Sequence, residues 1–246
     1  MTPKIFILLL VASVLPATAG GFIELEGGWT DVVSDVVRIP GDTGTEFSLV
    51  DDFDVESMAY ARFKLSGRLA DRHRLELLAA PLSFTATGDA PADIHFEGVN
   101  FPEGSSMEAL YRFDSYRISW LRRMGDGLGR WSWELGLTAK LRDAEVTLES
   151  PELRSSKENR GFVPLIALRV DGRLNAAWSL RLEADALAAP RGQGRAEDVL
   201  VALSRRLGSA MDLSLGYRFV EGGADVDEVY NFAYIHYLAA GLRYRF

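Results

Sequence analysis

The stretch YNFAYIHYLAAGLRYRF, residues 230–246, decides the fold. Its side chains alternate between two kinds with a period of two, which is the pattern of a β-strand with two different faces. The stretch is about twice as long as an ordinary globular strand, and a strand of this length spans a bilayer when it is tilted. One face carries Phe232, Tyr234, His236, Leu238, Ala240, Leu242, Tyr244 and Phe246, and the other carries Tyr237, Ala239, Gly241, Arg243 and Arg245.

This terminal strand resembles the last strand of bacterial outer-membrane β-barrels, in which the barrel assembly machinery reads an apolar face that ends on a terminal aromatic residue. Here that face ends in Tyr244 and Phe246. In architecture the whole chain is similar to small barrels of the OmpA-like and OmpW-like kind. The resemblance implies a location in the Gram-negative outer membrane and an assembly signal at these two residues. It carries no catalytic motif.

The composition excludes several classes of protein. The chain has 246 residues, of which 48% are hydrophobic, and it lacks the long apolar runs of a helical membrane protein. A net charge of −8 argues against nucleic-acid binding. The sequence contains no cysteine, which removes disulfides and thiolate metal sites and suits a protein that crosses an oxidising periplasm unfolded.

The first 19 residues have the features of a cleaved secretory signal peptide. Lys4 precedes an apolar core over residues 5–15, and the small residues of 17–19 form an A-x-A cleavage site ahead of Gly20. The apolar core is too short for an anchor helix that spans a membrane. We therefore expect an exported protein with a signal peptide over residues 1–19 and a barrel domain over residues 20–246.

From residue 21 onward, alternating stretches return with turn signals between them. They predict an all-β fold, an antiparallel up-and-down transmembrane barrel of about ten strands. Eight strands remain possible if two of the less regular stretches are loops. We expect a bulge or an irregular rim near Pro81 and a bulge near Asp114, where the alternation is disturbed. The predicted strands lie around residues 23–29, 59–66, 74–79, 111–121, 131–142, 162–171, 178–185, 199–203, 213–219 and 230–246.

A soluble barrel or sandwich also alternates, with its apolar face turned inward. Two features favour the membrane barrel. Short connections alternate with long ones over residues 31–56, 87–106 and 143–161, as in outer-membrane barrels. Aromatic residues gather near the strand ends, as interfacial girdles do, at Trp29, Trp120, Trp131, Trp133, Trp178, Tyr244 and Phe246.

If the apolar face meets lipid, the charged residues point into the lumen. A barrel of eight to ten strands is narrow enough for side chains to fill, and buried charges must be paired or hydrated. We predict a salt-bridged, largely plugged lumen, with a narrow passive channel for small polar or hydrophobic solutes as the alternative. The predicted inward charges are Glu24, Glu26, Arg62, Lys64, Arg74, Glu76, Arg117, Glu134, Lys140, Arg142, Arg169, Asp171, Arg181, Glu183, Asp185, Arg218, Arg243 and Arg245.

Candidate chemistry is sparse, because the sequence contains none of the common catalytic or nucleotide-binding motifs. We expect His73 beside a short turn, His95 in a long connection and His236 at the outer lipid interface. We predict no catalytic residue, no metal site and no cofactor. An enzyme that modifies lipid A, or a protease, is the third alternative. Acids at the predicted outer rim could imitate those of omptin-type proteases, although the surrounding sequence does not match the omptin motifs: Asp51, Asp52, Asp54, Asp225, Asp227 and Glu228.

The predicted connections are polarised in charge. The long connection over residues 31–56 is acidic, with a lone Arg38, whereas the short turns are rich in arginine. Divalent cations bind carboxylate oxygens, so this connection could join the cation-bridged lipopolysaccharide layer. Simple solvation is the alternative. We expect a monomer with a structural or interaction role, whose partners are outer-membrane lipids, lipopolysaccharide and the assembly machinery.

Overall fold

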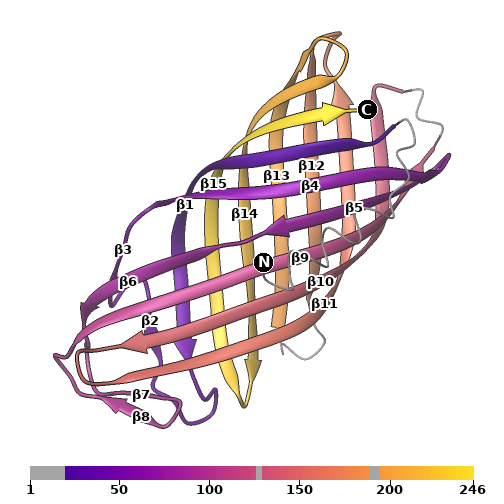
Figure 1. The fold of residues 1–246 in the computed structure, drawn as a ribbon. Coiled ribbons are helices and arrows are strands. Elements are labelled where there is room, and N and C mark those ends of the chain that lie inside the picture. The colour runs from indigo at the N-terminus through magenta and orange to yellow at the C-terminus, as the bar shows by residue number, and fades with distance from the viewer. Residues whose placement is uncertain (1–19, 126–128, 189–193) are drawn as a thin grey trace.

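The C-terminal stretch forms strand β15 (Val229–Arg245), and both of its edges are paired. One edge pairs antiparallel with β14 (Met211–Val226) and the other with β1 (Phe22–Arg38). Because β1 is the first strand and β15 the last, this pairing closes the sheet into a barrel (Figure 1). The computed structural model describes residues 20–125, 129–188 and 194–246, so the predicted signal peptide lies outside the described residues.

The wall has ten strand positions, which confirms the predicted number and excludes eight. No helix in the described ranges is long and apolar enough to cross a membrane. After β1 the wall continues through β4 (Met58–Ala70), β5 (His73–Ala80) with β6 (Ser83–Asp89), β9 (Ser106–Met124), β10 (Trp131–Glu149), β11 (Arg154–Arg173), β12 (Trp178–Ala188), β13 (Gly194–Leu207), β14 and β15.

The two ends of the barrel differ (Figure 1). The end that carries the C-terminus and the short turns is the turn end. The opposite end, the loop end, carries the short strands β2 (Phe47–Ser48), β3 (Asp54–Val55), β7 (Ile94–Phe96) and β8 (Val99–Phe101). β2 pairs with β1 and β3 pairs with β6, while β7 and β8 form a separate hairpin.

The outside of the wall is apolar along the middle of the strands. Leu137, Leu215 and Leu238 are 62%, 61% and 60% exposed. Soluble monomers rarely expose large contiguous apolar patches, so this surface suits contact with hydrocarbon. We call it the apolar belt; it comprises Ile23, Leu25, Trp29, Phe63, Ile118, Trp120, Leu135, Leu137, Leu141, Ile166, Val201, Leu203, Leu213, Leu215, Tyr217, Leu238 and Leu242.

The bulge predicted near Asp114 is wrong. β9 pairs with β10 in one unbroken register, so its side chains keep the same parity throughout. Toward the loop end, Met107, Ala109 and Tyr111 are apolar and buried on the inward face. The disturbed alternation therefore marks a change in what fills the barrel, because the interior is charged toward the turn end and apolar toward the loop end.

The bulge predicted at Pro81 is a break between two strands. β5 and β6 pair with β9 in the same register on either side of it. Proline cannot donate to the ladder, and the backbone resumes when Phe113 N donates to Leu82 O at 2.8 Å. The bulge that does occur in β1 lies between Val32 and Ser34, and it exchanges the inward and outward faces of that strand.

Of the long connections predicted over residues 31–56, 87–106 and 143–161, the last is largely strand, and the first two begin with the ends of β1 and β6. The hairpin of β10 and β11 stays paired as far as Glu149 and Arg154, so residues 143–161 contain no loop of the predicted length. Beyond the apolar belt, the outward side chains of this hairpin are polar or charged. A strand that is predicted from its outward apolar residues alone therefore ends too early, at the edge of the apolar belt.

The apolar belt makes a prediction about substitutions. Leu137→Arg should lower the free energy of unfolding by about 2–4 kcal/mol, because it places a charge against the hydrocarbon core. Glu108→Arg is the matched control, since Glu108 is exposed on β9 toward the loop end. Its effect should be close to zero. Urea unfolding in phospholipid vesicles measures both, and an equal or larger effect of Glu108→Arg would contradict a lipid-facing belt.

Candidate functional site

Asp198 of β13 lies at the centre of the lumen, where three guanidinium groups contact its carboxylate. Arg62 of β4 and Arg117 of β9 each place a nitrogen 2.7 Å from Oδ2, and Arg218 of β14 contacts Oδ1. Asp198 is buried, as are the three arginines. One carboxylate therefore holds together side chains from three other strands of the wall.

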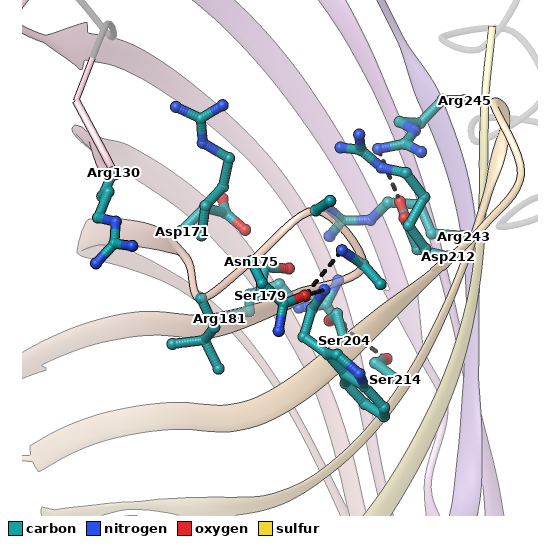
Figure 2. Close-up of a pocket in the computed structure, with 16 residues that line it drawn as sticks. Arg130, Asp171, Asn175, Ser179, Arg181, Ser204, Asp212, Ser214, Arg243 and Arg245 are labelled. Carbon is teal, nitrogen blue, oxygen red and sulfur yellow. Dashed lines mark hydrogen bonds and ion pairs between the residues drawn. The ribbon is translucent and has the colours of Figure 1, made fainter.

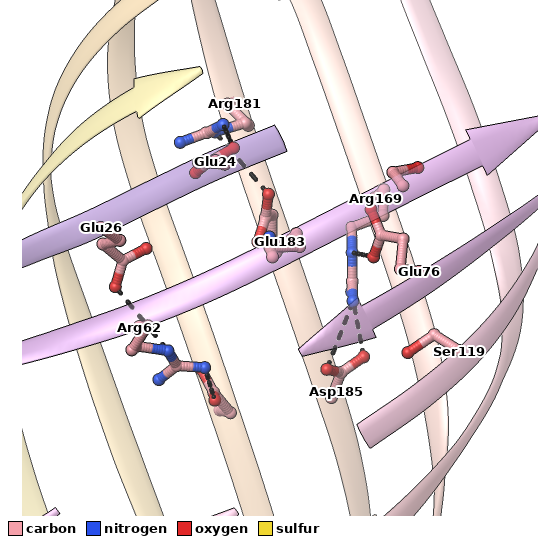
Figure 3. Close-up of polar contacts among 12 residues, drawn as sticks. Glu24, Glu26, Arg62, Glu76, Ser119, Arg169, Arg181, Glu183 and Asp185 are labelled. Carbon is pink, nitrogen blue, oxygen red and sulfur yellow. Dashed lines mark hydrogen bonds and ion pairs between the residues drawn. The ribbon is translucent and has the colours of Figure 1, made fainter. Parts of the chain in front are cut away.

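Further ion pairs extend this network toward the turn end (Figure 3). Glu24 of β1 accepts hydrogen bonds from Arg181 of β12 at 2.8 Å and from Arg243 of β15 at 2.6 Å. Lys64 of β4 donates to Glu183 of β12 at 2.5 Å, across the full width of the barrel. Most of these pairs join strands that are not neighbours in the wall. They cross the lumen and fill it.

The structure places most of the predicted inward charges in this network. Arg245 lies apart at the turn end, where it pairs with Asp212 at 3.1 Å. Asp171 also lies there and makes no ion pair with a described residue, and Lys140 and Arg142 make none toward the loop end. The lumen ion pairs contain Glu24, Glu26, Arg62, Lys64, Arg74, Glu76, Arg117, Glu134, Arg169, Arg181, Glu183, Asp185, Arg218 and Arg243.

Asp198 is absent from the predicted inward charges, although the sequence contains a signal that it points into the lumen. Val199 and Val201 point outward, so Asp198 shares the inward parity of Leu200 and Ala202. The predicted strand began at Val199 and therefore left Asp198 out. Starting the strand earlier, at Gly194 as the structure has it, would have included the central carboxylate.

At the turn end the lumen opens into a cavity of about 580 Å³, which we call the vestibule (Figure 2). Arginines dominate its lining, among them Arg130, Arg173 and Arg206, which are exposed. Its buried inner end includes Arg181 and Ser214, and Arg181 Nη2 donates to Ser214 Oγ at 3.1 Å. The vestibule is basic and open to water, and it ends where the ion-pair network begins.

Toward the loop end the lumen is filled by apolar side chains, which we call the apolar plug. The connection after β1 contributes Phe47, Leu49 and Phe53, all buried, and the Phe47 ring lies edge-on to those of Phe53 and Phe96. Three further cavities in the barrel measure only about 30, 20 and 10 Å³, room for about one water each. Other members of the plug are Val37, Ile39, Tyr60, Phe84, Phe101, Tyr111, Val146, Leu148 and Ile235.

Asp35 lies on β1 beyond the apolar belt, and its carboxyl group is buried in the apolar plug. The prediction that it belongs to an acidic outer connection is wrong, because β1 continues to Arg38 and the bulge after Val32 turns Asp35 inward. Asn231 Nδ2 donates to Oδ1 at 2.6 Å, while Oδ2 has no hydrogen-bond partner. Burial raises the pKa of Asp35 well above its usual range, and the hydrogen bond from Asn231 opposes this only in part.

The three histidines lie far apart, and none forms an ion pair with a carboxylate in the described ranges. His236 points outward, with ring centroids 5.4 Å from Tyr217 and 4.5 Å from Tyr234. His73 stacks on a tryptophan of β9 with a 5.3 Å centroid distance, and His95 is exposed on β7. Among the residues that the structure describes, no group of three His, Cys, Asp or Glu side chains is placed to hold a metal ion.

The acids compared with those of omptin-type proteases stabilise local turns or lie exposed. Asp52 Oδ2 accepts a hydrogen bond from Ser48 N at 2.7 Å, and Ser48 Oγ donates to Asp51 at 3.0 Å. Asp225 and Asp227 are exposed at the hairpin of β14 and β15. None of these acids forms a hydrogen bond or an ion pair with a histidine, so the described residues assemble no histidine and acid pair at this rim.

A closed antiparallel wall with an apolar outside and a charged inside has the construction of a bacterial outer-membrane β-barrel. No protein-family model matches the chain, and no curated protein matches its sequence. The chain is similar to the solved structure of the outer membrane protease OmpT from Escherichia coli, with a TM-score of 0.58 and 11% identity. The likeness covers 92% of this chain and 97% of that chain.

Two other solved structures match less well. Ail, the attachment invasion locus protein of Yersinia pestis, has a TM-score of 0.41 and 9% identity over 92% of this chain and 100% of that chain. OprG from Pseudomonas aeruginosa has a TM-score of 0.33 and 13% identity, over 93% and 97%. At such identities the likeness to OmpT concerns the fold alone. It confirms the predicted outer-membrane barrel fold, while the narrower likeness to OmpA-like and OmpW-like barrels is matched only loosely.

The ion-pair network predicts that a substitution at its centre strongly destabilises the barrel. Asp198→Ala should lower the free energy of unfolding by about 3–5 kcal/mol, because it leaves buried guanidinium groups without their shared carboxylate. Asp212→Ala is the control, since Asp212 and Arg245 form a single, partly exposed pair at the turn end. It should change stability by no more than about 1 kcal/mol. Equal effects in urea unfolding would show that Asp198 does not hold the lumen together.

Asp35 predicts a pH dependence. Its raised pKa keeps the carboxyl group protonated in the folded barrel, whereas the unfolded chain releases the proton near the ordinary value. The folded state therefore loses stability as pH rises from the ordinary pKa toward the raised one. Asp35→Asn should remove this loss.

Urea unfolding at pH 4 and pH 8 measures the effect as a difference between variant and parent. The gain of Asp35→Asn should be small at pH 4 and larger at pH 8. Asp42→Asn, at an exposed acid near the same end, should show no such trend. A gain that is the same at both pH values would contradict the buried, protonated carboxyl group.

Proposed function

We propose that this protein is an integral outer-membrane barrel with a structural or interaction role and a closed lumen. The observation that carries the proposal is the filling of the lumen, by cross-lumen ion pairs toward the turn end and by the apolar plug toward the loop end. The apolar belt supports residence in a bilayer. A barrel filled in this way can present its loop end to partners without passing solutes.

The same proposal assigns the partners. The turn end would face the periplasm, with Tyr244 and Phe246 on the strand that the assembly machinery reads. The loop end would face outward, where exposed acids such as Asp42, Asp51 and Asp54 meet the lipopolysaccharide layer and its bridging cations. We propose that the barrel acts there as a monomer.

A narrow passive channel is the second candidate, and the vestibule is the observation that favours it. A cavity of about 580 Å³, lined largely by polar and charged residues, already opens the turn end of the lumen. For the barrel to conduct, both the ion pairs around Asp198 and the apolar plug would have to rearrange. Catalysis is the third candidate, and no arrangement of side chains in the described ranges favours it. That the chain is not an enzyme stays a prediction.

Conductance separates the first two candidates. The protein, refolded and inserted in planar bilayers, should pass no steady current, because both halves of its lumen are filled. A general porin in the same bilayers provides the positive control, and heat-modifiable gel mobility shows that the silent sample is folded. Reproducible single-channel steps that scale with salt concentration would replace the closed-lumen proposal with the channel.

A further inference from the structure

A cavity of about 420 Å³ passes through the barrel wall above the end of β12. β12 ends at Ala188, and the pairing of β11 with β12 ends at Ile166. Among the described residues, the rest of β11 toward the loop end pairs only with β10. The cavity lies between this part of β11 and the start of β13. Its lining includes Phe162, which points outward, and Lys140, which points inward. We call it the side cavity.

Two cations at the inner end of the side cavity have no carboxylate partner among the described residues. Lys140 is buried, and its Nζ lies 4.8 Å from the ring centroid of Phe113. Arg142 donates through Nη2 to Asn159, and its Nε is buried without a hydrogen-bond partner. Every other cation of the predicted lumen set forms an ion pair. Unpaired buried charge is costly, so an anion bound between these two side chains would relieve a cost that the protein alone leaves uncompensated.

Apart from Arg195, the rest of the lining is apolar. Phe162 and Pro164 form one wall and Leu187 lies at the end of β12, while Arg195 of β13 is already paired with Glu221 on the outside. A free inorganic anion would meet this apolar surface without using it. An anionic head with an attached apolar chain would use both parts of the cavity.

The side cavity also opens at the level of the wall where an amphiphile would change from apolar chain to polar head. Along the outward face of β11, the apolar Ile166 and Phe162 give way to the charged Arg160 and Glu158. Along β13, outward Val201 and Val199 are followed by charged residues in the same way. The side cavity therefore opens at the edge of the apolar belt, where acyl chains end and polar heads begin.

We propose that the side cavity binds an anionic amphiphile, with its carboxylate or phosphate head on Lys140 and Arg142 and its acyl chain along Phe162 and Leu187 against the belt. The volume falls within the usual range of small-molecule sites. The proposal goes beyond the closed lumen, because a ligand that enters from the side needs no path along the barrel axis. The result of the conductance measurement therefore neither supports nor contradicts it.

Equilibrium binding to the refolded protein in neutral detergent micelles tests the proposal. The probes are tritiated palmitate, tritiated dipalmitoyl phosphatidate, hexadecanol as a neutral amphiphile, and inorganic phosphate as a head without a chain. We expect palmitate or phosphatidate to bind, and whichever binds more tightly identifies the source of the head group. The double variant Lys140→Met, Arg142→Met should lose at least tenfold in affinity.

Matched variants keep the result interpretable. Neither Lys140 nor Arg142 has an ion pair to lose, so the double variant should fold, which heat-modifiable mobility checks. Leu187→Trp, which fills the side cavity and keeps both cations, should also abolish binding. Arg160→Met, an exposed cation on the outside of β11, should leave it unchanged.

Several outcomes would overturn the proposal. They are binding of neither charged amphiphile, equal binding of hexadecanol, binding of inorganic phosphate as tight as that of phosphatidate, and undiminished binding to a folded double variant or to Leu187→Trp.

Discussion

Most charges inside this barrel depend on a partner from another part of the wall. A β-strand turns only every second residue inward, and the partners of Lys64 and Arg62 lie on β12 and β13, far around the barrel. Removing an ion from water costs several kcal/mol unless a well-placed counter-ion compensates. This requirement specifies the register of the whole sheet, because a slip of one residue on any of these strands would turn its charge into the apolar belt and leave the partner alone.

The two halves of the interior follow different physical rules. Around Asp198 the contents are polar and directional, with each group held by specific hydrogen bonds, whereas around Phe47 the contents are apolar and held by packing. Lys140 and Arg142 lie where these halves meet. They continue the charged inward pattern of β10, but Lys140 lies over the Phe113 ring and Arg142 donates to Asn159. Neither therefore forms an ion pair with a carboxylate of the described residues.

The sequence was sufficient to predict much of this architecture. The alternation of β15 and of β10 identified the faces and the strand number, because an apolar outside and a charged inside give opposite signals at neighbouring positions. The same alternation was misleading wherever the outward face became polar and the inward face became apolar. Beyond the belt, β9 turns Tyr111 inward and charged residues outward, and the pattern was misinterpreted as a bulge at Asp114. Asp35 was missed because one extra residue at Val33 reverses the faces of β1. Which cations would lack partners could not be predicted, since pairing depends on distances across the lumen.

The cross-lumen pairs also have a consequence before the barrel exists. Glu24 on the first strand meets Arg243 on the last and Arg181 on β12, so these contacts form only when the two edges of the sheet come together. Until then the same side chains are free to be hydrated, so each unpaired strand would present a partly charged face to water. A chain that crossed an aqueous compartment before insertion would benefit from such a face, because it would oppose aggregation. The charges that lock the finished lumen would thus also help to keep the unfinished chain dispersed in solution.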